Sequence, residues 1–108
     1  GVAEEILIQL SYAIGIAKPI GIYCNTYNSS KLGLNDLEIS KKIENLFDLR
    51  PAFIEERLKL RNPIYELSAA YGHMGRNPKT IKVGGVQCES FTWEKLDYVD
   101  LIKKEFNL

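Results

Sequence analysis

Hydrophobic and polar residues alternate along two stretches near the start of the chain. In residues 5–12 one face carries Ile6, Ile8, Leu10 and Tyr12. Residues 20–27 repeat the alternation, and a period of two in side chains that favour strands predicts half-buried strands in both stretches. The residues between them are too few and too small to form a crossover helix, so we expect the two strands to pair antiparallel through a tight connection.

The pattern changes to helical spacing after Asn35. Glu38 stands three positions beyond this asparagine, which is the spacing of a capping box. The apolar residues that follow recur at helical intervals: Ile39, Ile43, Leu46 and Phe47. The sequence therefore predicts an amphipathic helix that ends near Asp48.

Two prolines mark further helix starts. Pro51 and Pro63 each suit the first helical turn, where a missing N–H costs nothing, and a short apolar pattern follows each of them. We therefore expect two short helices, the second closed by Gly72 as its C-cap. Its apolar positions are Ile64, Leu67 and Tyr71.

The last third of the chain predicts a hairpin and a helix. Gly84 and Gly85 separate two β-prone runs at 80–83 and 86–91, which is a hairpin signal. Thr92 is the expected N-cap of a final helix. The apolar stripe of that helix is Leu96, Val99, Ile102 and Phe106.

Composition narrows the class of protein. The 108 residues are 45% hydrophobic and 26% charged, with 14 basic and 14 acidic side chains. The balance of charge argues against a nucleic-acid partner, and the short apolar runs exclude a transmembrane segment. Two cysteines and one histidine cannot form a disulfide scaffold or a structural zinc site, so the cytoplasm is the expected location. The chain begins at Gly1 without an initiator methionine, so we expect a piece of a longer polypeptide.

Few single residues suggest chemistry. His73 lies between two glycines and has an acid–base pKa, yet no nucleophile stands near it in the sequence, so a backbone turn is the favoured interpretation. Cys24 falls on the apolar face of a predicted strand and is expected to be a packed thiol. Cys88 is expected to have no role. The sequence identifies no catalytic residue and no metal ligand.

Charged residues cluster in two places. The middle of the chain is rich in cations with interleaved glutamates, and local ion pairs on a solvated surface are favoured over an RNA or nucleotide site. These cations are Arg50, Arg57, Lys59, Arg61, Arg76, Lys79 and Lys82. The last predicted helix carries carboxylates among lysines, so solvation is favoured there over metal chelation.

Residues 11–17 form an unusual stretch of small and apolar side chains. Glycine and alanine at a strand end allow another backbone or a flat ligand to approach closely. A tight corner of the hairpin explains the same composition, and the residues alone do not decide between the two.

Five phrases occur in a fixed order along the chain. They are IQLSYAIGIAKP at 8–19, FDLRP at 47–51, LRNPIY at 60–65, AAYGHMGR at 69–76 and TWEK at 92–95. Together they resemble S-adenosylmethionine synthetase (methionine adenosyltransferase), and the likeness covers roughly the last quarter of such an enzyme, within its C-terminal domain.

The resemblance implies an α+β fold. A small mixed or antiparallel sheet would pack on helices as part of the C-terminal domain of a three-domain, pseudo-threefold enzyme. Residues 1–108 would be a single domain, with 77–90 as an inserted hairpin or loop where many relatives have few residues.

The resemblance also implies an activity. The parent enzyme would join ATP and L-methionine into S-adenosylmethionine, release phosphate and diphosphate, and use Mg²⁺ and K⁺. It would work as a homo-oligomer, a dimer or a dimer of dimers, with one sheet face against the partner subunit. Ile14 would line the substrate pocket, with Ala13 and Gly15 shaping the wall beside it.

The catalytic histidine, aspartate and lysine motifs of the family are not in this chain. We therefore expect the chain alone to be inactive and to bind no cofactor. The alternative is a noncatalytic interaction or regulatory module with the same fold, and a nucleotide-binding module is a third possibility. Catalytic motifs in the reading frame upstream of Gly1 would favour the parent enzyme.

Overall fold

A computed structural model describes residues 1–108 and divides them into two compact units. Unit 1 contains residues 1–51 and 99–108, and unit 2 contains residues 52–98. Both are built from a two-stranded antiparallel sheet and short helices, so the predicted α+β class is confirmed. The assignment of the whole chain to one domain stays a prediction.

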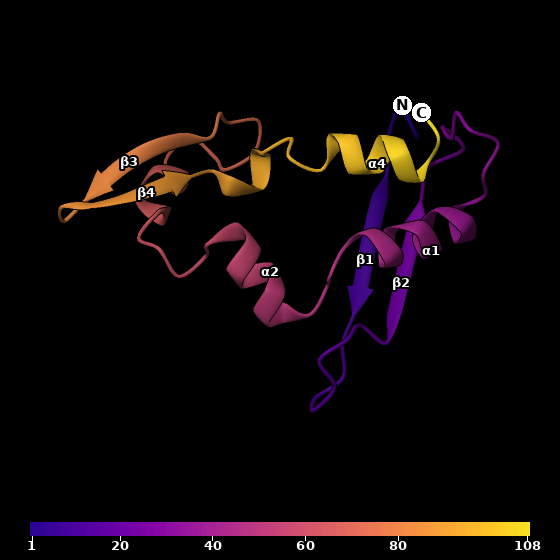
Figure 1. Cartoon of the computed structure of the whole chain (residues 1–108), viewed down its shortest axis with the longest axis horizontal. Helices are drawn as coiled ribbons and strands as arrows, with labels where there is room; N and C mark the ends of the chain where they lie inside the picture. The colour runs from indigo at the N-terminus through magenta and orange to yellow at the C-terminus, as the bar shows by residue number, and fades with distance from the viewer. The chain divides into compact units, whose positions relative to one another are not determined.

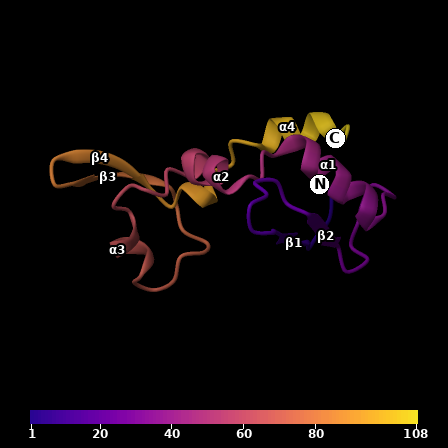
Figure 2. The ribbon, with the colours of Figure 1, turned by 90° about the horizontal axis from the view of Figure 1, so that it is seen from below.

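In unit 1, strands β1 (Leu7–Ser11) and β2 (Gly21–Asn25) pair antiparallel, as the alternation predicted (Figure 1). Ile8 lies opposite Cys24, so both side chains point to the same face of the sheet. Helix α1 (Asp36–Leu46) packs on β2, and helix α4 (Val99–Glu105) packs on α1. Figure 2 shows both helices on one side of this sheet.

The core of unit 1 lies between α1, β2 and α4. Its buried side chains are Cys24, Ile39, Ile43 and Phe106. The ammonium of Lys42 donates to the Glu105 carbonyl at 2.8 Å and lies 5.4 Å from the centre of the Phe106 ring, which ties α1 to α4.

The predicted capping box at the start of α1 is confirmed. The Glu38 backbone N–H donates to the Asn35 side chain and the Asn35 N–H donates to the Glu38 carboxylate, both at 2.9 Å. Asp36, in the first turn, also accepts from the Thr26 hydroxyl at 2.6 Å, so the end of β2 is joined to the start of the helix.

β1 differs from the predicted half-buried strand. Only Leu10 is partly covered, whereas Leu7 is 44% and Ile8 43% exposed. The physical reason is that α1 packs on β2, so the side chains of β1 are left largely uncovered. The connection from β1 to β2 is also an extended loop, residues 12–20, and not the tight link that we expected.

Unit 2 contains α2 (Pro51–Leu58, whose first residue belongs to unit 1), α3 (Tyr65–Ser68), β3 (Lys79–Val83), β4 (Val86–Ser90) and the 3₁₀ turn η1 (Thr92–Glu94). The helix start at Pro51 and the hairpin are confirmed. Gly84 and Gly85 have φ of +57° and +82°, as the two central residues of a type I′ turn require. That this hairpin is an insertion within the family stays a prediction.

Several details of the predicted helices are wrong. α3 begins at Tyr65 with Ile64 as its N-cap, so Pro63 does not lie in its first turn. The helix is a single turn capped by Ala69, so Gly72 does not close it, and Tyr71 is fully exposed. Thr92 is too far from the start of the last helix to cap it, and its hydroxyl instead donates to the Leu58 carbonyl at 2.6 Å. The last helix begins only at Val99, and Leu96 is left 81% exposed outside it.

Candidate functional site

The loop that joins β1 to β2 presents Ile14 at its tip. The Ile16 N–H donates to the Ala13 carbonyl at 3.2 Å and closes a turn whose central residues are Ile14 and Gly15. Gly15 has φ of +83°, which a type II turn requires at this position and which favours glycine. The turn therefore sets the direction of the Ile14 side chain, and this side chain is fully exposed.

The base of the loop is fixed by two hydrogen bonds. The Ile20 N–H donates to the Ser11 carbonyl at 2.8 Å, so the strand ends stay together. The Tyr12 hydroxyl donates to the Leu49 carbonyl at 2.6 Å and joins the loop to the segment that follows α1. A large apolar side chain is thus held away from the core on a supported turn.

A groove of about 420 Å³ lies beside the base of this loop, within unit 1. Lys18 and Pro19 line one part of it, and Phe47, Asp48 and Arg50 line another. Ile14 does not line it. Lys18 and Arg50 bring positive charge to the groove, and Glu44 and Asp48 bring negative charge.

Asp48 and Arg50 form a fork-shaped ion pair. Arg50 Nη2 lies 2.6 Å from Asp48 Oδ2, and Arg50 Nε lies 2.9 Å from Asp48 Oδ1. The hydrogen bond from Arg50 lowers the pKa of the Asp48 carboxyl, and the nearby charge of Lys18 acts in the same direction. The carboxylate therefore stays ionised in the groove and offsets the charge of Arg50.

The structure brings the predicted substrate-binding residues together. Ala13, Ile14 and Gly15 share one turn, and a Cβ added at Gly15 would have no atom within 4 Å. Their role in binding stays a prediction. Sequence reasoning missed the groove, although its residues include part of the FDLRP phrase at 47–51.

The remaining candidate residues, Cys24, Cys88 and His73, have structural roles. Cys24 is buried, and burial raises the pKa of its thiol, so the predicted packed thiol is confirmed. Cys88 is also buried, within the hairpin, so it has a packing role that the sequence did not predict. His73 lies in a turn of unit 2, where its carbonyl accepts from Trp93 Nε1 at 2.7 Å.

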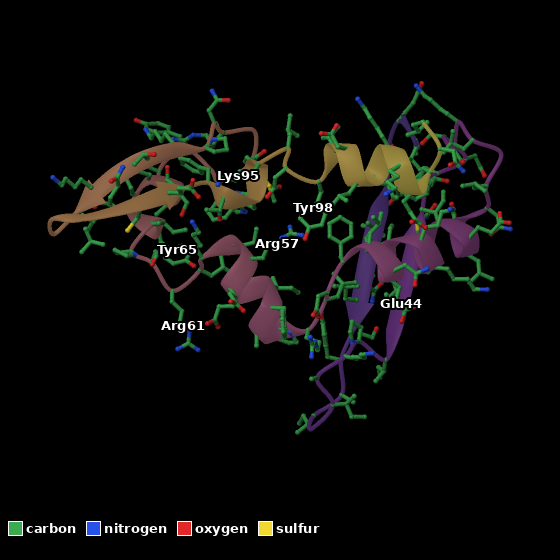
Figure 3. The ribbon with its side chains drawn as sticks, viewed as in Figure 1. Glu44, Arg57, Arg61, Tyr65, Lys95 and Tyr98 are labelled. Atoms are coloured by element: carbon green, nitrogen blue, oxygen red, sulfur yellow. The ribbon has the colours of Figure 1, made fainter.

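The charged clusters behave as solvated surfaces. Arg61 pairs with Glu55, and Lys59 and Lys95 both pair with Glu89. The guanidinium of Arg57 lies 4.5 Å from the centre of the Tyr98 ring, and Figure 3 labels both residues. No group of three or more His, Cys, Asp or Glu gathers where it could hold a metal ion. No helix is long and apolar enough to cross a membrane.

Comparison with known proteins gives a consistent result. Residues 1–95 match the family described as "S-adenosylmethionine synthetase, C-terminal domain". The whole chain is 60% identical to part of the S-adenosylmethionine synthase of Phocaeicola vulgatus and 58% identical to part of that of Flavobacterium johnsoniae, covering 27% and 28% of these proteins.

A solved structure is also similar. It is described as an unusual S-adenosylmethionine synthetase from Campylobacter jejuni, and it superposes with a TM-score of 0.79 at 30% identity. The match covers 97% of this chain and 25% of that one. The chain thus spans about a quarter of the length of the relatives that it matches.

Proposed function

The chain belongs to the S-adenosylmethionine synthetase family, and we propose that it forms the C-terminal part of an enzyme that makes S-adenosylmethionine. The proposed enzyme, a methionine adenosyltransferase, transfers the adenosyl group of ATP to the sulfur of L-methionine and releases phosphate and diphosphate. The proposal concerns the whole protein, of which a chain of this size would be about a quarter.

The observation that carries the proposal for this chain is the exposed Ile14. An apolar side chain on a supported turn has no structural role inside unit 1, because nothing in the core depends on it. It is suited to cover an apolar part of a substrate and to exclude water there. Gly15 leaves the space beside it open, so a substrate can approach the backbone closely, and Ala13 adds only a small side chain.

The chain's part in catalysis is proposed to be positioning. Displacement of a triphosphate needs several positive charges around the leaving group, and the charge of Arg50 is already offset by Asp48. Mg²⁺ and K⁺ are proposed for the whole enzyme. The residues of this chain form no cluster that fits a metal, so no step is assigned to a metal here.

The proposed setting is a cytoplasmic homo-oligomer, a dimer or a dimer of dimers. The open face of β1 and β2 supports this proposal, because it exposes Leu7 and Tyr23, and exposed apolar side chains on a small unit are typical of a subunit contact. No nucleic acid or membrane partner is proposed.

A product assay tests the function. The whole protein, given ATP, L-methionine, Mg²⁺ and K⁺, should form S-adenosylmethionine, and the 108-residue chain alone should form none. Ile14→Asp in the whole protein should abolish turnover of methionine while the far-ultraviolet circular dichroism spectrum stays unchanged, because a charge would replace the apolar wall. Turnover by the isolated chain after repurification, or full activity of the Ile14→Asp enzyme, would contradict the proposal.

A further inference from the structure

Unit 2 contains an apolar pocket of about 510 Å³ that the proposed activity does not use. It lies among α2, α3, the turn at 73–74 and η1. Its lining includes Leu60, Tyr65, His73, Met74, Trp93 and Glu94. Figure 3 labels Tyr65, which α3 contributes to the pocket.

The polar atoms of the two large aromatic residues are already bonded within unit 2. The Tyr65 hydroxyl donates to the Leu60 carbonyl, and Trp93 Nε1 donates to the His73 carbonyl at 2.7 Å. The Trp93 ring is further held by edge-to-face contacts with Phe91 and His73. Since their polar atoms have partners, Tyr65 and Trp93 offer a ligand aromatic surface.

Glu94 brings a negative charge to this pocket without a cation beside it. Its carboxylate accepts from the Gly75 N–H at 2.6 Å, and none of the six ion pairs in the structure includes it. The neighbouring lysine, Lys95, is paired with Glu89. Arg76 donates to the Ala70 and Gly72 carbonyls and lies over the Phe91 ring.

We propose that this pocket binds an alkylated onium cation, a tetraalkylammonium or trialkylsulfonium group. Aromatic faces attract cations electrostatically, and the attraction strengthens when the cation is desolvated. A simple ammonium holds its water firmly, whereas a methylated cation has an apolar exterior that suits an apolar pocket. The unpaired carboxylate of Glu94 adds the complementary charge. The proposal is independent of the synthetase activity.

Trp93 is the only tryptophan in the chain, so its fluorescence reports directly on the pocket. The test titrates the chain with choline and with 3,3-dimethylbutan-1-ol, its neutral isostere, at constant pH and ionic strength. Calorimetry follows the same titrations. Choline should bind about tenfold more tightly than the alcohol.

Two matched variants localise the effect. Glu94→Gln keeps an oxygen for the Gly75 N–H but removes the charge, so choline should lose most of its advantage over the alcohol. Glu66→Gln removes a charge from exposed α3, outside the pocket lining, and should change neither affinity. Tyr65→Leu removes an aromatic wall and should also weaken choline binding. This variant decides the test if Glu94→Gln disturbs the fold.

A further titration with trimethylsulfonium distinguishes a tetraalkylammonium ligand from a trialkylsulfonium ligand. The cation that binds more tightly, choline or trimethylsulfonium, identifies the class that the pocket prefers. The proposal is overturned if the alcohol binds as tightly as choline, which would indicate a purely apolar site. It is also overturned if Glu94→Gln and Tyr65→Leu, both folded, leave choline affinity unchanged, or if neither fluorescence nor calorimetry detects choline.

Discussion

The two antiparallel sheets have strands of equal length but very different surroundings. β3 and β4 are joined by two glycines, bury Cys88 and Ser90, and place Lys79 and Lys82 on β3, one of the two edge strands. β1 and β2 are joined by the long loop at 12–20 and expose apolar side chains on both faces, Ile8 (43%) on the face that α1 covers in part and Leu7 (44%) and Tyr23 (54%) on the open face.

The β3–β4 hairpin is therefore self-sufficient, whereas the β1–β2 sheet is incomplete. Charged residues on an edge strand protect it from unwanted pairing, and the hairpin has them. The β1–β2 sheet has α1 on one face only, and its apolar loop and its open face have no cover within unit 1. We infer that these uncovered parts are contact surfaces, the loop for substrate and the open face for a second subunit.

The largest expected effect concerns the open face. Leu7→Lys should prevent self-association of the chain, because a symmetric contact loses two buried leucines at about 1.5–3 kcal/mol each and gains two charges. Light scattering across a dilution series measures it. Val83→Lys, on the hairpin, is the matched control and should leave the association constant unchanged. A wild-type chain that stays monomeric at high concentration would contradict the inference.

The next largest effect should show how far the β1–β2 sheet depends on helix α1 for its stability. Ile39 is fully buried between α1 and β2, so Ile39→Ala should lower the free energy of unfolding by about 2–5 kcal/mol. Leu37→Ala on the exposed side of α1 should change it by less than about 0.5 kcal/mol. Hydrogen exchange should show lost protection in β2 and retained protection in β3 and β4. Equal loss in both sheets would show that they share one core.

A smaller effect should follow from the turn of the hairpin. Gly85→Ala should lower stability by about 1 kcal/mol, because φ is +82° there and no neighbour compensates for the strain. Gly21→Ala in β2 is the control, since an added Cβ would meet only Ser11 at an ordinary 3.8 Å. Denaturant titration of both variants checks the difference, and equal stability would show that the glycine turn is not required.

The smallest effect is electrostatic. The hydrogen bond from Lys95, with Lys59 nearby, lowers the pKa of the Glu89 carboxyl on β4. A pKa lowered by folding contributes stability above the unfolded pKa, and this stability is lost as the pH falls through the folded pKa. Lys95→Met should raise the pKa of Glu89 toward its usual range in an NMR titration, with the remaining lowering due to Lys59, whereas the pKa of Asp48, held by Arg50, should not move.

Local signals predicted the elements that depend on neighbouring residues. The capping box of Asn35 and Glu38, the helix start at Pro51 and the Gly84–Gly85 turn each act within a few residues, so the sequence was sufficient for them. The family resemblance, confirmed by the comparisons, came from ordered phrases spread along the chain.

Long-range contacts explain the errors. Thr92 resembles a cap, but its hydroxyl bonds to Leu58, 34 positions earlier in the chain. The burial of β1 depends on where α1 packs, which alternation does not reveal. The same limit applies to the groove beside the loop, because its lining comes from residues 18–22 and 44–50, and only folding brings these together.

The most direct test of the account compares two exposed apolar side chains, Ile14 on the loop and Val86 on the hairpin. In the whole protein, Ile14→Ala should lower kcat/KM for methionine by about 10–200-fold, since a branched side chain against substrate contributes ~1–3 kcal/mol. Val86→Ala should leave it unchanged, and neither should alter the unfolding free energy by more than about 0.5 kcal/mol. Unchanged kinetics for Ile14→Ala, or an equal loss for Val86→Ala, would contradict the claim that the uncovered loop is a substrate surface.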